Sequence, residues 1–188
     1  MEKQNVSGKP TICIRMKNHA EIVVELYPQS APNAVNSILE LIDQKGFEEL
    51  QIQRIAPDFV LQPWFDEVHM DQRYQYVMEK EICPEFSFAR YTVGMAGNEE
   101  IASCGCIFFV MGDGCEERLN GKFTGAGKVI SGFDELERIM HVKTREVVCD
   151  MEGVVVREPV IPEVIQEITY ELNGYERKKV VKRLEVFA

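Results

Sequence analysis

The chain has 188 residues, a formal net charge of −10 at pH 7, and 45% hydrophobic residues. This length fits one domain with a core of its own, and the acidic balance argues against a nucleic-acid partner because the phosphate backbone would be repelled. We expect a single domain over residues 1–188, with a core at about 11–172 and a C-terminal extension at 173–188.

The start of the chain and its cysteines indicate the compartment. The opening stretch MEKQNVSGKP lacks the apolar run of a signal peptide, and no later stretch approaches the roughly 20 apolar residues of a membrane span. The six cysteines lack the paired spacing of a secreted disulfide scaffold or a zinc site. We therefore expect a soluble, cytoplasmic protein with reduced thiols, no membrane contact and no metal.

The first quarter of the chain predicts a hairpin followed by a helix. Residues 11–16 and 21–26 are short runs rich in β-branched residues, with turn-forming residues between them. A helix is predicted after the proline-rich segment at 28–32, and Gly46 closes it. Its apolar residues recur at helical spacing: Val35, Ile38, Leu39 and Ile42.

Most of the remaining chain predicts strands. These are residues 52–55, 59–62, 91–96, 106–111, 128–130 and 164–172. A second short helix begins at Gly132, with Leu136, Ile139 and Met140 on one face. Many antiparallel strands with only two helices indicate a mainly β fold, a closed antiparallel β-barrel of about eight strands capped by the two helices.

Four motifs follow one another along this order of elements. They are IQRIAPDFVLQ at 52–62, TVGMA at 92–96, SCGCIFFV at 103–110, and LNGK at 119–122 followed by GKV at 127–129. Together they resemble the cyclophilin-type peptidyl-prolyl cis-trans isomerases. The resemblance runs from about residue 11 to about residue 172, and it implies the cyclophilin barrel.

The resemblance also implies roles for individual residues. Arg54 matches the catalytic arginine, and Gln62 matches the glutamine that steadies it. The positions that contact the substrate correspond to Phe59, Val60, Ile107, Phe109, Leu119 and Phe123. The resemblance further implies proline-containing peptides or unfolded proteins as partners, a monomer, and no cofactor or metal.

An arginine suits this chemistry on physical grounds. Rotation about an Xaa-Pro bond faces a barrier of about 18–20 kcal/mol, because the imide nitrogen shares its lone pair with the carbonyl group. In the twisted transition state the lone pair localises on nitrogen, so a rigid donor binds that state better than either planar state. Arginine keeps its proton and holds its donors in a fixed fork.

Several positions depart from the family's pattern. They are Gln53, Asp58, Pro63, Trp64, Ile107, Arg118, Phe123 and Ala126. Two hypotheses therefore stay open: an isomerase with altered peptide preference, or a catalytically weak or inactive binding module with the same fold. Arg118 stands where the family has a tryptophan at the pocket rim, which predicts weak or absent cyclosporin affinity.

Three further patterns each have a functional and a simpler interpretation. Cys104-Gly105-Cys106 is either a redox or metal pair or part of the core. The group Asp66, Glu67, His69 and Asp71 either binds a cation or coats a loop. The basic segment at 175–188 is either a partner-binding tail or a solvated terminal element. We favour the simpler interpretation of each.

Overall fold

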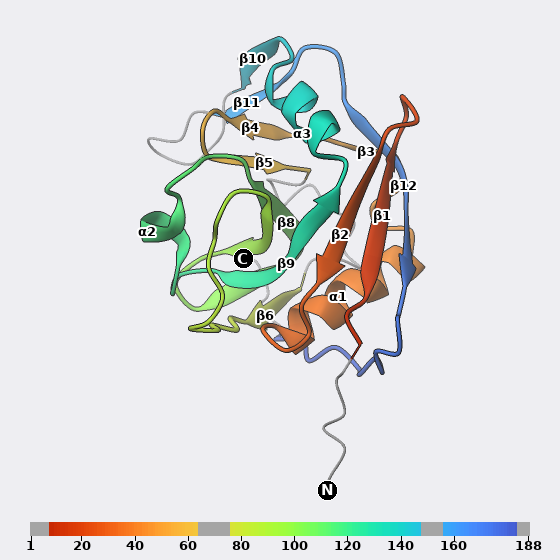
Figure 1. Cartoon of the computed structure of the whole chain (residues 1–188), viewed down its shortest axis with the longest axis vertical. Helices are drawn as coiled ribbons and strands as arrows, with labels where there is room; N and C mark the ends of the chain where they lie inside the picture. The colour runs from red at the N-terminus through yellow and green to blue at the C-terminus, as the bar shows by residue number, and fades with distance from the viewer. Residues whose placement is uncertain (1–7, 64–75, 148–155, 184–188) are drawn as a thin grey trace, which may run out of the picture.

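Ten antiparallel strands form one curled sheet around a core, with a helix at one end (Figure 1). The computed structural model describes residues 8–63, 76–147 and 156–183. The strands of this sheet are β1 (Thr11–Met16), β2 (Glu21–Leu26), β3 (Leu50–Gln51), β4 (Arg54–Ala56), β5 (Val60–Gln62), β6 (Val77–Glu79), β7 (Thr92–Gly97), β8 (Ile101–Val110), β9 (Thr124–Ser131) and β12 (Val164–Glu171). A separate pair consists of β10 (Thr144–Val147) and β11 (Val156–Pro159), and the helices are α1 (Pro32–Asp43), α2 (Glu116–Leu119) and α3 (Phe133–Met140).

The order of strands explains the curl. Neighbours follow the path β3-β12-β1-β2-β9-β7-β8-β5-β4, and β6 pairs with β8 beside it. The two edge strands, β3 and β4, are separated in sequence only by Ile52 and Gln53. Ile52 donates its backbone N–H to Glu163 at 2.8 Å, and Gln53 donates to Gln62 at 3.1 Å. The sheet therefore curls until both edges meet at this short link.

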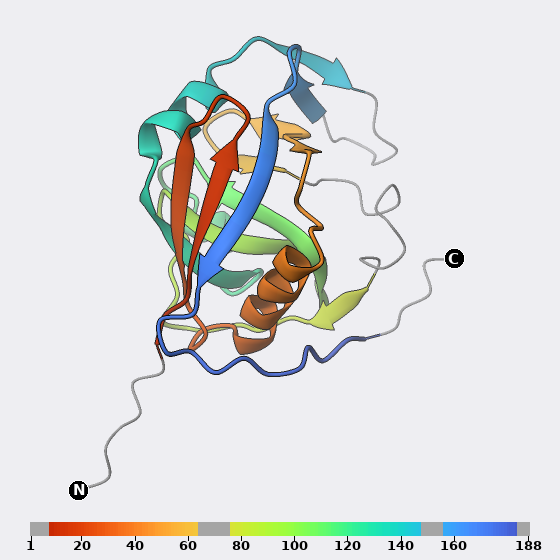
Figure 2. The ribbon, with the colours of Figure 1, turned by 90° about the vertical axis from the view of Figure 1, so that its right-hand side faces the viewer.

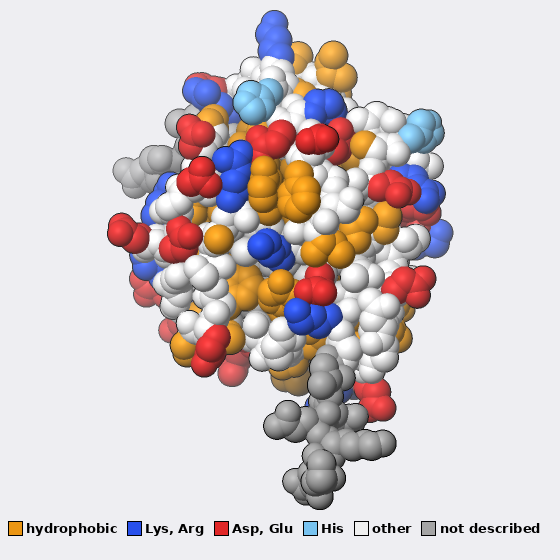
Figure 3. Space-filling view, in the orientation of Figure 1, with side chains coloured by type: hydrophobic (Ala, Val, Ile, Leu, Met, Phe, Trp, Pro, Cys, Tyr) orange, Lys and Arg blue, Asp and Glu red, His pale blue; other side chains and the backbone are white. Residues whose placement is uncertain are grey.

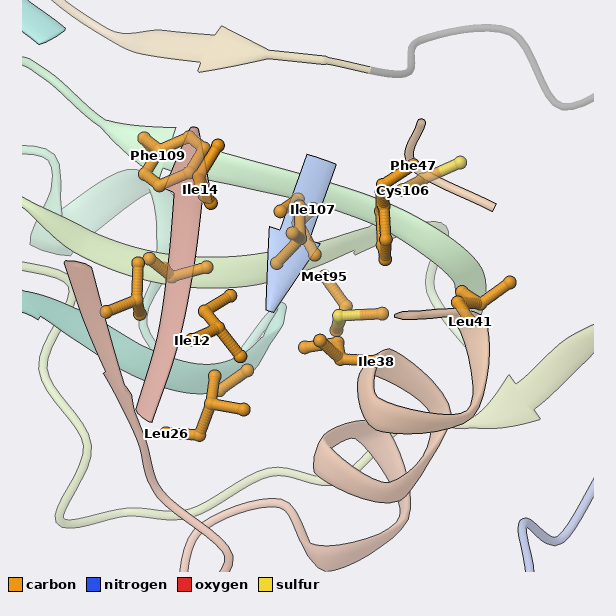
Figure 4. Close-up of a cluster of buried hydrophobic side chains, with 14 of the residues drawn as sticks. Ile12, Ile14, Leu26, Ile38, Leu41, Phe47, Met95, Cys106, Ile107 and Phe109 are labelled. Atoms are coloured by element: carbon orange, nitrogen blue, oxygen red, sulfur yellow. The ribbon is translucent and has the colours of Figure 1, made fainter. Parts of the chain in front are cut away.

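Alternating side chains build the main core. Ile12, Ile14 and Met16 of β1 are buried, whereas the residues between them are half-buried or exposed, as a strand with one buried face requires. The helix α1 packs its apolar face against the sheet (Figure 2), and its residues Ile38 and Leu41 lie among strand residues in Figure 4. Burial of this face stabilises α1, and the Glu81 carboxylate caps its start by accepting hydrogen bonds from the backbone N–H groups of Asn33 at 3.0 Å and Ala34 at 2.9 Å.

The mainly β, barrel-like fold expected from the sequence is confirmed, with more elements than predicted. The first hairpin and the start of the last strand lie at the predicted residues, and α1 contains the predicted apolar face. The strands β3, β6, β10 and β11 and the helix α2 were not predicted. Each has only two to four residues, too short for a periodic pattern to emerge. The strand β8 begins at Ile101, five residues before its predicted start.

The described part of the C-terminal extension packs against the domain. Residues 173–183 run along α1 (Figure 2), where Asn36 accepts a hydrogen bond from the backbone of Lys178 at 3.0 Å. Arg183 donates its backbone N–H to Val77 of β6 at 2.7 Å. Tyr175 and Val180 are buried. The segment up to residue 183 is therefore tied down, unlike the solvated terminal element that we favoured. None of the helices in the described ranges is long and apolar enough to cross a membrane.

Candidate active site

The β4–β5 hairpin holds Arg54 and Gln62 side by side. The two residues are directly opposite in the hairpin register, and Nη1 of Arg54 donates to Oε1 of Gln62 at 2.5 Å. Gln62 is buried and Arg54 is half-buried. Because the acceptor is packed in place, it restricts the plane of the guanidinium and orients its remaining N–H groups. The hairpin thus presents an oriented cation at the edge of the sheet.

A tight turn sets the register of this hairpin. Phe59 donates its backbone N–H to Ala56 at 3.1 Å, across Pro57 and Asp58. Asp58 has a φ of 52°, in the left-handed region that aspartate tolerates better than most residues with a side chain. The turn therefore accommodates an aspartate at the position where the family has glycine, and Phe59 lies at the turn end of the hairpin.

A second cluster of apolar side chains lies apart from the main core. Its buried members are Val60, Phe86, Phe88, Phe108, Val110, Cys115 and Leu119, and Tyr27, Ala56, Phe59, Cys83, Ala96 and Phe123 pack against them. Val60 and Gln62 alternate with Leu61 along β5, so they share one face of the strand. The second cluster therefore begins on the same face of the hairpin as the pair Arg54–Gln62.

Phe109 does not lie in the second cluster, which corrects its predicted placement beside Phe59. Val60 pairs with Val110 and Leu61 pairs with Phe109 across β5 and β8. Phe109 therefore faces the main core with Leu61, and Phe108 lies in the second cluster instead. The physical reason is the period of two along a strand, since a shift of one residue moves a side chain to the opposite face.

Ile107 is also placed in the main core and not at the substrate side. It pairs with Met95 of β7, is 1% exposed, and points into the core in Figure 4. The same alternation accounts for its position, because Ile107 and Phe109 share one face of β8. The structure therefore separates Ile107 and Phe109 from the other predicted site residues.

Glycines on two neighbouring strands make room for the aromatic rings of the second cluster. A Cβ on Gly94 would lie 2.5 Å from Cζ of Phe108 and 2.6 Å from Cε1 of Phe88. A Cβ on Gly125 would overlap the ring of Phe86. The rings form edge-to-face and stacked pairs, with centroids 4.9 Å apart for Phe86–Phe88 and 5.7 Å apart for Phe88–Phe108. Because Gly94 and Gly125 have no side chain, the rings of Phe86, Phe88 and Phe108 can pack directly against the backbone of these strands.

The segment around α2 covers the second cluster from outside. Leu119 is 2% exposed within it, and the ring of Phe123 meets that of Phe108 edge-on, with centroids 5.8 Å apart. The Arg118 guanidinium carbon lies 3.6 Å from the centroid of the Phe59 ring. Such a cation–π contact at an exposed site contributes about 0.5–1 kcal/mol. Arg118, predicted at the rim of the pocket, thus packs on Phe59, and Phe123, predicted within the pocket, packs on Phe108.

Comparison with known proteins identifies the family of this chain. The family model described as cyclophilin type peptidyl-prolyl cis-trans isomerase/CLD matches residues 11–167. The chain belongs to this cyclophilin-type family. A probable peptidyl-prolyl cis-trans isomerase of Brucella suis is 30% identical over 140 residues, which cover 69% of this chain and 70% of the relative. Peptidyl-prolyl cis-trans isomerase 10 of Caenorhabditis elegans is 27% identical over 158 residues, covering 81% and 91% respectively. The family and these relatives support a peptidyl-prolyl cis-trans isomerase.

Solved structures agree on the cyclophilin fold. The crystal structure of a cyclophilin type peptidyl-prolyl cis-trans isomerase of Cryptosporidium parvum has a TM-score of 0.72 to this chain at 20% identity, and covers 87% of this chain and 98% of that one. A second crystal structure of that protein, in the presence of the dipeptide Ala-Pro, has a TM-score of 0.71.

Phe108 is the residue of the second cluster that sequence reasoning missed. All ten residues of β8 are buried, so no alternation of polar and apolar residues indicates which side chains face outward. Gly105 has a φ of 66° within the strand, and the pairing of β7 with β8 shifts between Met95 and Gly97. The glycine was the available signal, because an isolated glycine in a strand often marks an irregular register.

The other chemical motifs contribute little to this site. Burial raises the pKa of Cys104 to about 12, so this thiol is protonated at neutral pH, and Cys106 is buried as well. Within residues 8–63, 76–147 and 156–183, no three His, Cys, Asp or Glu side chains are grouped to hold a metal ion. Trp64 and the acidic group from Asp66 to Asp71 lie outside the described residues.

Proposed function

We propose that Arg54 drives proline isomerisation in this chain by donating to the prolyl nitrogen in the twisted transition state. The observation that carries this proposal is the 2.5 Å hydrogen bond from Arg54 to the buried Gln62, on the face of the hairpin where the second cluster begins. Gln62 fixes the direction of the guanidinium, and a donor aimed in advance does not have to reorganise during the reaction.

Apolar side chains near the hairpin have two roles in this mechanism: they hold the proline ring, and they strengthen the hydrogen bond from Arg54. A proline ring that is held while its acyl partner turns needs an apolar contact surface, and we assign this role to Phe59 and Val60 of the hairpin and Leu119 of α2, which belong to the same cluster. Apolar neighbours also lower the local dielectric, which strengthens the hydrogen bond to the developing lone pair. In this mechanism the residues need no nucleophile and no general base.

The substrates that we propose are proline-containing segments of unfolded or flexible proteins, so that the chain assists folding. The Cryptosporidium parvum relative in fold was crystallised in the presence of the dipeptide Ala-Pro, which supports ligands of this class. We further infer that the chain acts as a cytoplasmic monomer without a cofactor.

One observation favours a second candidate, a binding module with little or no catalysis. Val60, Phe108 and Leu119 are only 2–3% exposed, and Arg118 rests on Phe59. A proline ring can reach these buried side chains only if the residues that cover them, Arg118 over Phe59 among them, move outward. The free energy of that movement would be drawn from substrate binding, which lowers the apparent affinity.

Exchange NMR on an Ala-Pro peptide distinguishes the two candidates. A small amount of the chain should accelerate cis-trans exchange above the thermal rate, and Arg54→Ala should remove most of that acceleration. Arg15→Ala is the matched control, because Arg15 lies on β1 with Glu21 and Glu167 as its ion-pair partners. Binding of the peptide without any acceleration by the wild type would favour the binding module.

A further inference from the structure

Arg118 differs from most of the other described arginines in what it contacts. Seven arginines form ion pairs with carboxylates: Arg15, Arg90, Arg138, Arg145, Arg157, Arg177 and Arg183. Acidic and basic side chains accordingly lie next to one another over much of the face in Figure 3. Within the described ranges no carboxylate is at ion-pair distance from Arg118, which lies over the ring of Phe59.

This arrangement is unexpected in so acidic a chain. There are 31 Asp and Glu residues against 21 Lys and Arg, and Glu116 and Glu117 immediately precede Arg118 in α2. The helix nevertheless directs its cation toward the hairpin of Arg54 and away from these carboxylates. The Arg118 side chain is exposed, so its charge is accessible to a ligand approaching Phe59.

We propose that Arg118 is a specificity-determining residue, which selects proline segments with a carboxylate side chain close to the proline. The inference rests on the proposed function only in taking the face with Arg54, Phe59 and Leu119 as the proline site. A carboxylate offers the guanidinium a planar, bidentate partner.

The position of Arg118 makes this selection compatible with proline binding. When the guanidinium leaves the face of Phe59 for a substrate carboxylate, the ring that it covered becomes available to an apolar group of the same ligand. One movement of Arg118 therefore forms the charged contact and uncovers the apolar one. Both kinds of segment have to displace Arg118 from the ring of Phe59. An acidic segment gains an ion pair with Arg118 in return, whereas a neutral segment gains none.

The overall charge of the protein acts against the binding of acidic peptides. A net charge of −10 repels acidic peptides at long range, so a preference for them has to come from a local cation. Added salt should weaken the local ion pair, which lowers the affinity for acidic peptides, and should also screen the long-range repulsion, which raises that affinity. A substrate preference that follows Arg118 and not the overall charge distinguishes this proposal from general electrostatics.

The test uses three peptides that carry Glu, Gln or Lys beside a single Ala-Pro unit, titrated into the full chain while amide NMR shifts report the Kd. The wild type should bind the Glu peptide roughly fivefold more tightly than the Gln peptide, the effect of one exposed ion pair. Arg118→Gln should bring that ratio to about one, and Arg118→Glu should invert it in favour of the Lys peptide. Arg15→Gln, a matched loss of one positive charge on β1, should keep the wild-type ratio.

The outcomes separate this inference from the proposed function. Equal Kd values for the Glu and Gln peptides in the wild type, a ratio unaffected by Arg118→Gln, or binding of none of the peptides would overturn the inference. The exchange rates of the same samples report on the proposed function. A Glu preference without acceleration would contradict the role of Arg54 and leave the role of Arg118 standing.

Discussion

Phe108 lies so close to Gly94 on the neighbouring strand that a Cβ on this glycine would be 2.5 Å from the phenylalanine Cζ. The contact places one of two consecutive phenylalanines in the second cluster and leaves Phe109 to the main core. Since the second cluster borders the hairpin of Arg54, the register of β8 determines which aromatic ring can contribute to a proline site.

Replacing Gly94 with alanine should destabilise the protein by about 1–3 kcal/mol, the usual range for overpacking a core. The rings of Phe108 and Phe88 are 3% and 1% exposed, so neither can move aside freely. The free energy of unfolding from urea denaturation measures the loss. In a Phe108→Leu background the alanine should cost less, because part of the overlap is gone. An equal cost in both backgrounds would contradict the contact.

Phe108→Leu and Phe109→Leu should have similar effects on stability but different effects on peptide affinity, because the two rings belong to different clusters. Each change removes a buried ring and should lower the free energy of unfolding by about 1–3 kcal/mol. Only Phe108→Leu should alter the Kd for an Ala-Pro peptide, because Phe109 belongs to the main core together with Ile14 and Leu61. The assignment fails if peptide affinity responds to Phe109→Leu and not to Phe108→Leu.

Gln62 should act as a positioning residue for Arg54. Gln62→Ala removes the acceptor at 2.5 Å and frees the guanidinium to rotate, so kcat/KM for peptide isomerisation should fall roughly tenfold. Gln62→Glu keeps an acceptor of similar length and should retain more activity. Circular dichroism and urea denaturation check that both variants fold. If Gln62→Glu is as impaired as Gln62→Ala, the hydrogen bond is not the cause.

Glu137 should make stability depend on acid pH. Burial alone would raise the pKa of this carboxyl group, but hydrogen bonds from Arg90 at 2.7 Å and Tyr91 at 2.8 Å outweigh it and hold the pKa below the ordinary value. A lowered folded pKa stabilises the protein above the unfolded pKa, near 4.3, and this contribution is lost as the pH falls through the folded pKa.

The comparison of wild type with Glu137→Gln measures this contribution. The difference in the free energy of unfolding should be largest near neutral pH, at up to about 1 kcal/mol because the side chain is partly exposed. It should shrink below about pH 4. Glu171→Gln, at the exposed end of β12, serves as the control. A difference that stays constant from pH 7 to pH 3 would contradict the pairing.

Short-range patterns in the sequence predicted the hairpin of β1 and β2 and the helix α1, because alternation and helical spacing are local. The same locality places Arg54, Phe59 and Gln62 on one hairpin, since only a two-residue turn separates β4 from Phe59. The conformations of these segments are determined by interactions between residues that are close in the sequence.

Two features of the site depend on distant parts of the chain. The side chains of β8 face opposite sides of a strand that is buried on both, so hydrophobicity carries no information on which of Phe108 and Phe109 faces outward. The contact of Arg118 with Phe59 joins a four-residue helix to the β4–β5 turn, which lies much earlier in the sequence. A helix this short has no periodic pattern that would predict its packing.

The measurement that tests the role of Arg54 most directly is the NMR exchange rate of an Ala-Pro peptide, recorded together with the peptide Kd for wild type, Arg54→Lys and Arg54→Ala. A donor that acts on the transition state should lower the exchange rate by roughly 100-fold or more when it is removed, while the peptide Kd changes little. Arg54→Lys should fall in between, because lysine keeps the charge without the fixed fork. Wild-type exchange rates in Arg54→Ala, with the peptide bound, would contradict the account.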